Sequence, residues 1–213
     1  MRSCFVRSFV VVLCSAFACS SNDLGARLQS TDPRVRITAV QELGSATDAA
    51  AALRTLGALL KSDPDKWVRA ETTFSIGKLH VRDGTVLLVA TAASQDDQTV
   101  RVAALTALER NPDPIAVPEL IALWRLERSN DDYVAHIGSD HALRAIGKPA
   151  VEPLLSVALD TKNRAYVRTN ALHVLQQIRD PSIRDRVAPL LDDPAPGVSS
   201  ATKGLLDVLD HPP

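Results

Sequence analysis

The chain has 213 residues, only 4% of them aromatic, and a formal net charge of −1 at pH 7. This balance argues against nucleic acid as a partner, because proteins that bind phosphate backbones carry a basic stripe on one face. Sparse aromatics together with abundant Ala and Leu favour closely packed helices over a sheet.

The first eighteen residues differ from the rest of the chain. Arg2 and Arg7 bracket a basic start, and an almost wholly apolar run follows over residues 9–18. The run is shorter than the roughly 20 residues that a membrane-spanning helix needs. It ends in a small-x-small pattern, which is typical of a secretory cleavage site. We therefore expect residues 1–18 to be a signal peptide; a buried N-terminal helix is the alternative.

All three cysteines, Cys4, Cys14 and Cys19, lie near the N-terminus, so cleavage after Ala18 would leave Cys19 without a disulfide partner. A Cys in this position, followed by polar residues, resembles a bacterial lipoprotein lipobox, although Ala16 stands where Leu is usual. The resemblance implies a lipid anchor at Cys19, a short tether over residues 19–23, and a place on the periplasmic side, at the outer membrane. Secretion without an anchor is the alternative.

A short phrase then recurs along the chain. A Val-Arg pair opens segments at Val35, Val68, Val100 and Val167, with apolar or small residues at offsets 0, 4, 5 and 8, the stripe of an α-helix. Weaker copies occupy residues 142–147 and begin at residue 198. A fixed period of about thirty residues indicates a repeat array, in which each unit buries its apolar face against its neighbours.

A second apolar segment with helical spacing follows each phrase, over residues 47–61, 83–94, 114–128, 148–160 and 181–191. The sequence thus predicts an all-α fold, an α-solenoid of about five to six helix–turn–helix repeats over residues 24–211, without a linker dividing it. Residues 22–30 would be the tail of a preceding second helix. Glycines are expected at helix ends that need positive φ, and interior prolines are expected to kink second helices. These residues are Gly44, Gly77, Gly147, Pro118, Pro153 and Pro189.

The pattern Asp-x-x-Val-Arg-x-x-Ala-Ala-x-x-Leu-Gly, followed by a shorter second helix, resembles HEAT-like repeats of the subtype named from phycobilisome lyases. The resemblance covers nearly the whole chain after residue 22 and implies that the second helices line the inner curve. It also implies a ladder of Asp and Arg side chains between adjacent units. The fourth unit departs from the pattern because it lacks Val-Arg, and the last has Ser199 where Arg is usual.

The arginines of the phrase have two interpretations. Three of them follow an Asp by four residues, a spacing at which side chains meet across one helical turn. We favour the structural ladder; a row of arginines that binds an anionic ligand is the alternative. The expected ladder residues are Asp32, Arg36, Asp65, Arg69, Asp97, Arg101 and Arg168.

Neither metal binding nor catalysis has support in the sequence. His136 and His141 are five residues apart, which is a poor spacing for ligands on one helix face. The chain contains no G-x-S-x-G motif and no phosphate-binding Gly-rich loop. We therefore expect no catalytic residue, no metal site and no cofactor.

Several large side chains are hard to place in the core. Aromatic residues and arginines are common anchors of protein interfaces, and a group of them surrounds the irregular segment between the third and fourth units. We favour the interpretation that the two tryptophans fill gaps between units; if the chain has one protein-binding hot spot, we expect it in this region. The candidate residues are Trp67, Trp124, Arg125, Arg128, Tyr133 and His136.

Taken together, the sequence favours a non-enzymatic, lipid-anchored adaptor of the bacterial cell envelope. It would be a monomer alone and would bind an unknown protein or peptide. One alternative is a lyase-like activity on a bulky ligand, as in the family's namesake. Another is a structural subunit of an envelope complex, which would cover an apolar patch at Val198, Leu205, Leu206 and Leu209 of the last helix.

Overall fold

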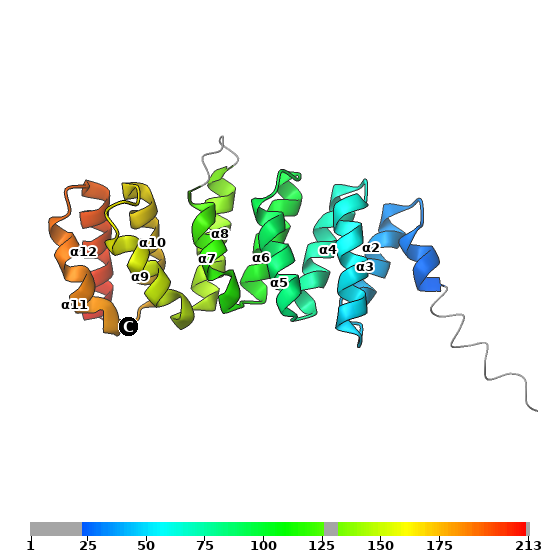
Figure 1. Cartoon of the computed structure of the whole chain (residues 1–213), viewed down its shortest axis with the longest axis horizontal. Helices are drawn as coiled ribbons and strands as arrows, with labels where there is room; N and C mark the ends of the chain where they lie inside the picture. Colours follow the sequence, from blue (N-terminus) through cyan, green and yellow to red (C-terminus); the bar gives the residue numbers. More distant parts are fainter. Residues whose placement is uncertain (1–22, 126–131, 212–213) are drawn as a thin grey trace, which may run out of the picture.

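The computed structural model describes residues 23–125 and 132–211, with only the backbone described over residues 132–137. Within these ranges the chain is helical and contains no strand (Figure 1). Residues 23–28 form a short helix, and helical pairs follow it. The first helices of the units are α2 (Pro33–Leu43), α4 (Lys66–Lys78), α6 (Gln98–Arg110), α8 (Asp132–Ile146), α10 (Ala165–Ile178) and α12 (Pro196–Asp210).

The second helices become shorter and more broken along the chain. The first two are α3 (Ala49–Ser62) and α5 (Arg82–Ala93). The third and fourth each begin with a 3₁₀ turn: η1 (Pro114–Ala116) before α7 (Val117–Leu123), and η2 (Lys148–Ala150) before α9 (Val151–Leu159). The fifth comprises η3 (Pro181–Ile183), α11 (Arg184–Val187) and η4 (Ala188–Asp192). The all-α solenoid expected from the sequence is confirmed, with five helical pairs between the first short helix and α12.

The helices form two layers that run along the array in chain order (Figure 1). Neighbouring first helices pack against one another, but α8 and α10 touch over a shorter stretch than the other neighbouring first helices. The loops that lead from a second helix to the next first helix lie along one edge, the upper one in Figure 1. We call this the loop edge; its described loops are residues 29–32, 63–65, 94–97, 160–164 and 193–195.

A single hydrophobic core runs between the two layers for the length of the array. Its largest fully buried aliphatic side chains come from both layers and from every unit beyond the first short helix. Each unit therefore completes its core only with its neighbours, as repeat architectures require. These side chains include Leu56, Ile76, Leu88, Leu105, Leu120, Leu143, Leu154 and Leu172.

The glycines have a different role from the one that the sequence suggested. Only Gly147 has a positive φ, of 71°, whereas Gly44 has a φ of −65° and Gly77 lies inside α4. A Cβ atom added at Gly44 would lie 3.0 Å from the Cα atom of Ser75 on α4. Gly44 thus allows two first helices to approach closely, and the expectation that it ends a helix with positive φ is wrong.

The prolines of the second helices do not kink long helices. Pro118 is the second residue of α7, Pro153 the third of α9, and Pro189 lies in η4. The missing N–H group of a proline costs little in the first turn of a helix, where no carbonyl four residues earlier is available. The chain therefore starts a new helical piece at these positions, and the expected kinks are replaced by 3₁₀ turns.

Both ends of the array are partly covered. At the start, Leu24 and Leu28 of the first short helix pack against the core while half-exposed. At the end, α12 lies against α10 and η4 and buries Val198 and Leu205 completely. The apolar patch expected on the last helix is therefore largely covered within the chain. None of the described helices has the length and apolarity needed to cross a bilayer.

Candidate functional site

The three aspartates expected in the ladder are helix N-caps instead. The Oδ1 atom of Asp65 accepts hydrogen bonds from the backbone N–H groups of Trp67 and Val68, at 2.8 and 3.2 Å. Asp32 and Asp97 cap α2 and α6 in the same way. The carboxylate of a cap turns toward the unpaired N–H groups of the first turn. It therefore does not extend to the arginine one turn later, and the proposed four-residue pairing is wrong.

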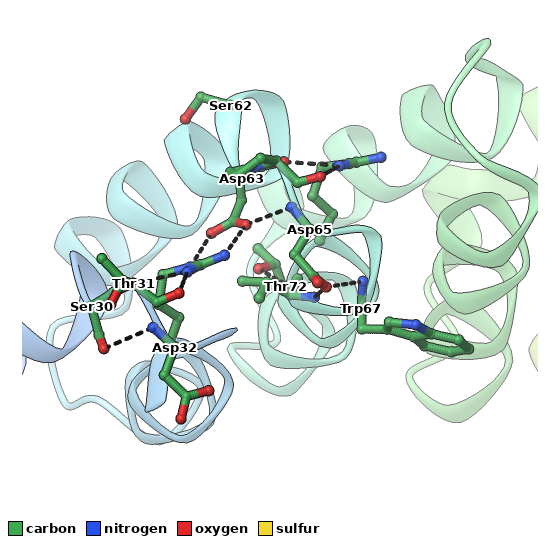
Figure 2. Close-up of polar contacts among 12 residues, drawn as sticks. Ser30, Thr31, Asp32, Ser62, Asp63, Asp65, Trp67 and Thr72 are labelled. Carbon is green, nitrogen blue, oxygen red and sulfur yellow. Dashed lines mark hydrogen bonds and ion pairs between the residues drawn. The ribbon is translucent and has the colours of Figure 1, made fainter. Parts of the chain in front are cut away.

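The ladder arginines bind a different set of carboxylates, each from the next unit boundary. The Nε and Nη2 atoms of Arg36 each donate to a carboxylate oxygen of Asp63, both at 2.8 Å (Figure 2). Arg69 binds Asp96 in the same two-pronged geometry, at 3.1 and 2.6 Å. Arg168 pairs with Asp193.

The same guanidinium groups also hold the loop edge through backbone carbonyls. The Nη1 atom of Arg36 donates to the carbonyl of Ser30, and that of Arg69 to the carbonyl of Asp63, both at 2.8 Å. Asp63 is thus bound twice, by Arg36 through its carboxylate and by Arg69 through its carbonyl. The buried Arg101 donates from Nε to the carbonyl of Ala92.

The surroundings of these groups are those of a structural ion pair. The side chains of Arg36 and Asp63 are only 10% and 3% exposed. The hydrogen bonds that Arg36 donates to Asp63 raise the pKa of Arg36, and the guanidinium of Arg168 lowers the pKa of Asp193. Guanidinium groups that are buried and already bound to carboxylates are poorly placed to take up an external anion.

The fourth unit replaces the ladder with an aromatic network. In the register of the repeat phrase, Ser139 of α8 stands where α4 has Arg69. Nearby, the indole Nε1 of Trp124 donates to Oδ1 of Asp140 at 2.9 Å, and the hydroxyl of Tyr166 donates to the carbonyl of Trp124 at 2.7 Å. Burial raises the pKa of Asp140 to about 6, although the Trp124 hydrogen bond opposes the shift.

Trp124 is therefore a core residue and not a surface anchor. Its side chain is completely buried and fills the space at the end of α7. Trp67, by contrast, is 59% exposed at the loop edge, with the ammonium of Lys66 5.7 Å from the ring centroid. Figure 2 shows its indole pointing away from the Asp63 carboxylate.

The remaining candidates are only partly described. Arg125 is exposed, and its Nη2 atom donates to Oδ1 of Asn163 at 3.1 Å. Cys19 and Arg128 lie outside the described residues, as do the side chains of Tyr133 and His136. Among the described residues, no three His, Cys, Asp or Glu side chains gather closely enough to hold a metal ion.

Sequence reasoning missed one feature of the loop edge. The loop of residues 160–164 places Lys162, Asn163 and Arg164 beside Arg125 and Tyr166, around one hollow of about 250 Å³. A signal was present in the sequence, because the N-cap of α10 is Arg164 whereas the caps of α2, α4 and α6 are all Asp.

The family model for HEAT repeats matches residues 20–77 and 53–139, which together span more than half of the chain. This chain belongs to the HEAT-repeat family. The match agrees with the helical pairs described above.

Two solved structures resemble this HEAT-repeat protein. One is the complex of CpcE and CpcF of phycocyanin lyase from Nostoc sp. PCC7120, with a TM-score of 0.50 and 22% identity over 97% of this chain and 82% of that one. The other is human deoxyhypusine hydroxylase in complex with glycerol, with a TM-score of 0.39 and 16% identity over 92% of this chain and 98% of that one. The first shows a shared fold. No curated protein matches the chain.

Proposed function

We propose that this HEAT-repeat protein is a non-enzymatic scaffold that binds a protein partner along its loop edge. The supporting observation is the distribution of exposed apolar surface. Of the five large apolar side chains that the described residues expose, four lie at or beside the loop edge: Trp67, Leu159, Tyr166 and Leu191. The fifth, Val86, lies on α5. Apolar side chains exposed along one edge would give a partner several separate points of contact.

The loop edge is also stiff enough to be recognised as a fixed shape. Its loops are tied by the pairs of Arg36 with Asp63 and of Arg69 with Asp96. Trp67 is the second residue of α4, and its backbone N–H donates to the capping carboxylate of Asp65, so its backbone is held as well. A surface ordered before binding loses little conformational entropy when a partner docks. Tryptophan is moreover enriched among the residues that contribute most to interface affinity.

Site-specific crosslinking tests this proposal. A photo-crosslinking phenylalanine analogue at position 67 samples the loop edge, and the same analogue at position 86 samples the second-helix face. We expect a discrete covalent adduct with one partner from position 67 and none from position 86. An adduct from position 86 alone would overturn the loop edge in favour of the second helices, the surface that the family resemblance suggested.

The proposal extends to the cell envelope, with Cys19 as the lipid attachment site. It is supported by the apolar run of residues 9–18 and by the small-x-small pattern before Cys19. We expect Cys19→Ala to move the protein from the membrane pellet to the soluble fraction, whereas Trp67→Ala stays in the pellet. A Cys19→Ala variant that still sediments with membranes would rule out the anchor.

A lyase-like activity on a bulky ligand is the second candidate. It is favoured by the fold shared with the CpcE–CpcF complex of phycocyanin lyase, a likeness that also fits a protein with protein partners. Mixing the purified protein with a free bilin separates the two candidates. A scaffold leaves the absorbance spectrum of the pigment unchanged, and a lyase-like protein shifts it.

A further inference from the structure

We propose that the hollow between the end of α7 and the α9–α10 loop binds a carboxylate of an acidic segment in the partner protein. We call it the basic pocket; it is lined by Arg125, Lys162, Asn163, Arg164, Tyr166 and Val167. The inference rests on the proposed scaffold function and names the chemistry that the partner must present.

Charge is the first reason. Three of the six lining residues are cationic and none is acidic. Asp160 lies in the same loop, but its carboxylate accepts hydrogen bonds from the backbone N–H of Lys162 at 3.0 Å and from Nδ2 of Asn163 at 3.3 Å. Asp160 therefore shapes the turn and offsets one of the three positive charges. Among the described residues that line the pocket, basic side chains outnumber acidic ones, in a chain whose overall net charge is −1.

Preorganisation is the second reason. Asn163 accepts from Nη2 of Arg125 and donates through Nδ2 to the carbonyl of Val157 at 3.2 Å, so it fixes the guanidinium to the loop. The hydroxyl of Tyr166 is bound to the carbonyl of Trp124, which leaves its 40% exposed ring at the side of the pocket. A guanidinium held in place matches a carboxylate through its fixed fork of donors and loses little entropy on binding.

Size and surroundings favour a peptide side chain over other anions. About 250 Å³ is below the roughly 300–1,000 Å³ of pockets that enclose a small molecule. Nucleic acid would need a longer basic stripe than one pocket provides. Leu159, 38% exposed at the end of α9, and the ring of Tyr166 offer apolar contacts to the residues that flank a bound Asp or Glu.

A labelled peptide tests the basic pocket directly. Fluorescence anisotropy would measure binding of a Glu-rich peptide, and of the same peptide with Gln in place of Glu, to the purified protein. We expect Arg125→Gln with Lys162→Gln to weaken binding of the Glu peptide at least about tenfold. The matched control is Arg54→Gln with Lys61→Gln on α3, where both residues are exposed. It removes the same charge and is expected to leave binding unchanged.

Several results would overturn the inference. Equal losses in the two double variants would mean that the peptide responds only to net charge. Binding to anionic phospholipid vesicles without binding to the Glu peptide would assign the pocket to a membrane surface. Where the Arg125 change affects folding, Lys162→Gln alone gives the answer, because the only bond described for Lys162 is made by its backbone. Failure of all peptide binding while position 67 still crosslinks to a partner would reject the basic pocket and leave the scaffold proposal standing.

Discussion

At the residue scale, the buried pair of Arg36 and Asp63 depends on the presence of both its members. Both side chains are buried, and every polar contact of the guanidinium is made within the protein. Removing one member of such a pair leaves an uncompensated charge in a poorly hydrated place. Asp63→Ala is expected to lower the free energy of unfolding by about 3 kcal/mol, measured by urea denaturation.

The exposed pair of Arg184 and Asp210 provides the control for this change. Its side chains are 49% and 38% exposed, so water solvates each partner when the other is removed. Asp210→Ala is expected to shift the unfolding midpoint far less than Asp63→Ala. Similar shifts for the two variants would show that the buried position of the ladder does not matter.

The carboxyl of Asp140 predicts a pH dependence of stability. Its pKa is about 6 in the folded protein, against an ordinary value of 3.8. Between these values the unfolded chain loses the proton first, so stability falls as the pH rises from about 4 to about 6. Asp140→Asn removes this loss and keeps an acceptor for Trp124. The variant should match the wild type at pH 4 and exceed it by roughly 2 kcal/mol at pH 8.

Comparing the free energy of unfolding of the variant and the wild type across the pH range separates the contribution of Asp140 from that of other groups. Asp193, whose pKa is lowered by Arg168, contributes stability that is lost on acidification, but it does so in both proteins. A difference in the free energy of unfolding that stays constant from pH 4 to pH 8 would contradict the raised pKa of the Asp140 carboxyl.

Three of the four ladder arginines pair with aspartates other than those that the sequence suggested. Spacing along the chain cannot show that Asp65 turns back to cap α4 while Asp63, two residues earlier, reaches Arg36. Asp63 and Asp65 belong to the same short loop. Which of them caps α4 and which pairs with Arg36 is decided by how the two units pack. The burial of Trp124 could not be predicted from the sequence for a related reason. Its side chain is buried at the end of α7 because α8 and α10 pack around it.

At the element scale, the spacing of the first helices depends on residues without side chains. Gly44 meets Ser75 of the neighbouring helix so closely that a methyl group requires one helix to move. Gly44→Ala is expected to destabilise the protein by roughly 1–3 kcal/mol. Gly25→Ala is the matched control, because nothing lies within 4 Å of its added Cβ, and it should be neutral or slightly stabilising. Thermal unfolding of both variants checks the pair; equal effects would contradict the close approach.

Element positions were predictable because the repeat phrase carries its own helical stripe. Each first helix begins within a few residues of the position that the sequence suggested, at Pro33, Lys66, Gln98 and Ala165 for the four full copies. The second helices were predicted as single segments, but proline divides the later ones into α-helical and 3₁₀ pieces. A proline is visible in the sequence, yet whether it kinks a helix or starts one depends on the preceding turn.

At the scale of the whole molecule, the covered ends predict a monomer. Val198 and Leu205 of α12 are fully buried within the chain, so no apolar face of the last helix demands a second subunit. The protein without residues 1–18 is expected to elute as a monomer from size-exclusion chromatography with light scattering at micromolar concentration. A stable dimer would instead favour the structural-subunit alternative.

The short contact between α8 and α10 has a mechanical consequence. This joint, which the packing of α9 against α10 also bridges, divides the molecule into two unequal arms, and we expect the array to bend here more readily than at its other joints. Arg125 precedes the joint and the loop of residues 160–164 leads into its far side. A carboxylate bound between Arg125 and this loop would connect the two arms. Binding in the basic pocket would therefore fix the angle between the arms and, with it, the shape that the array presents to its partner protein.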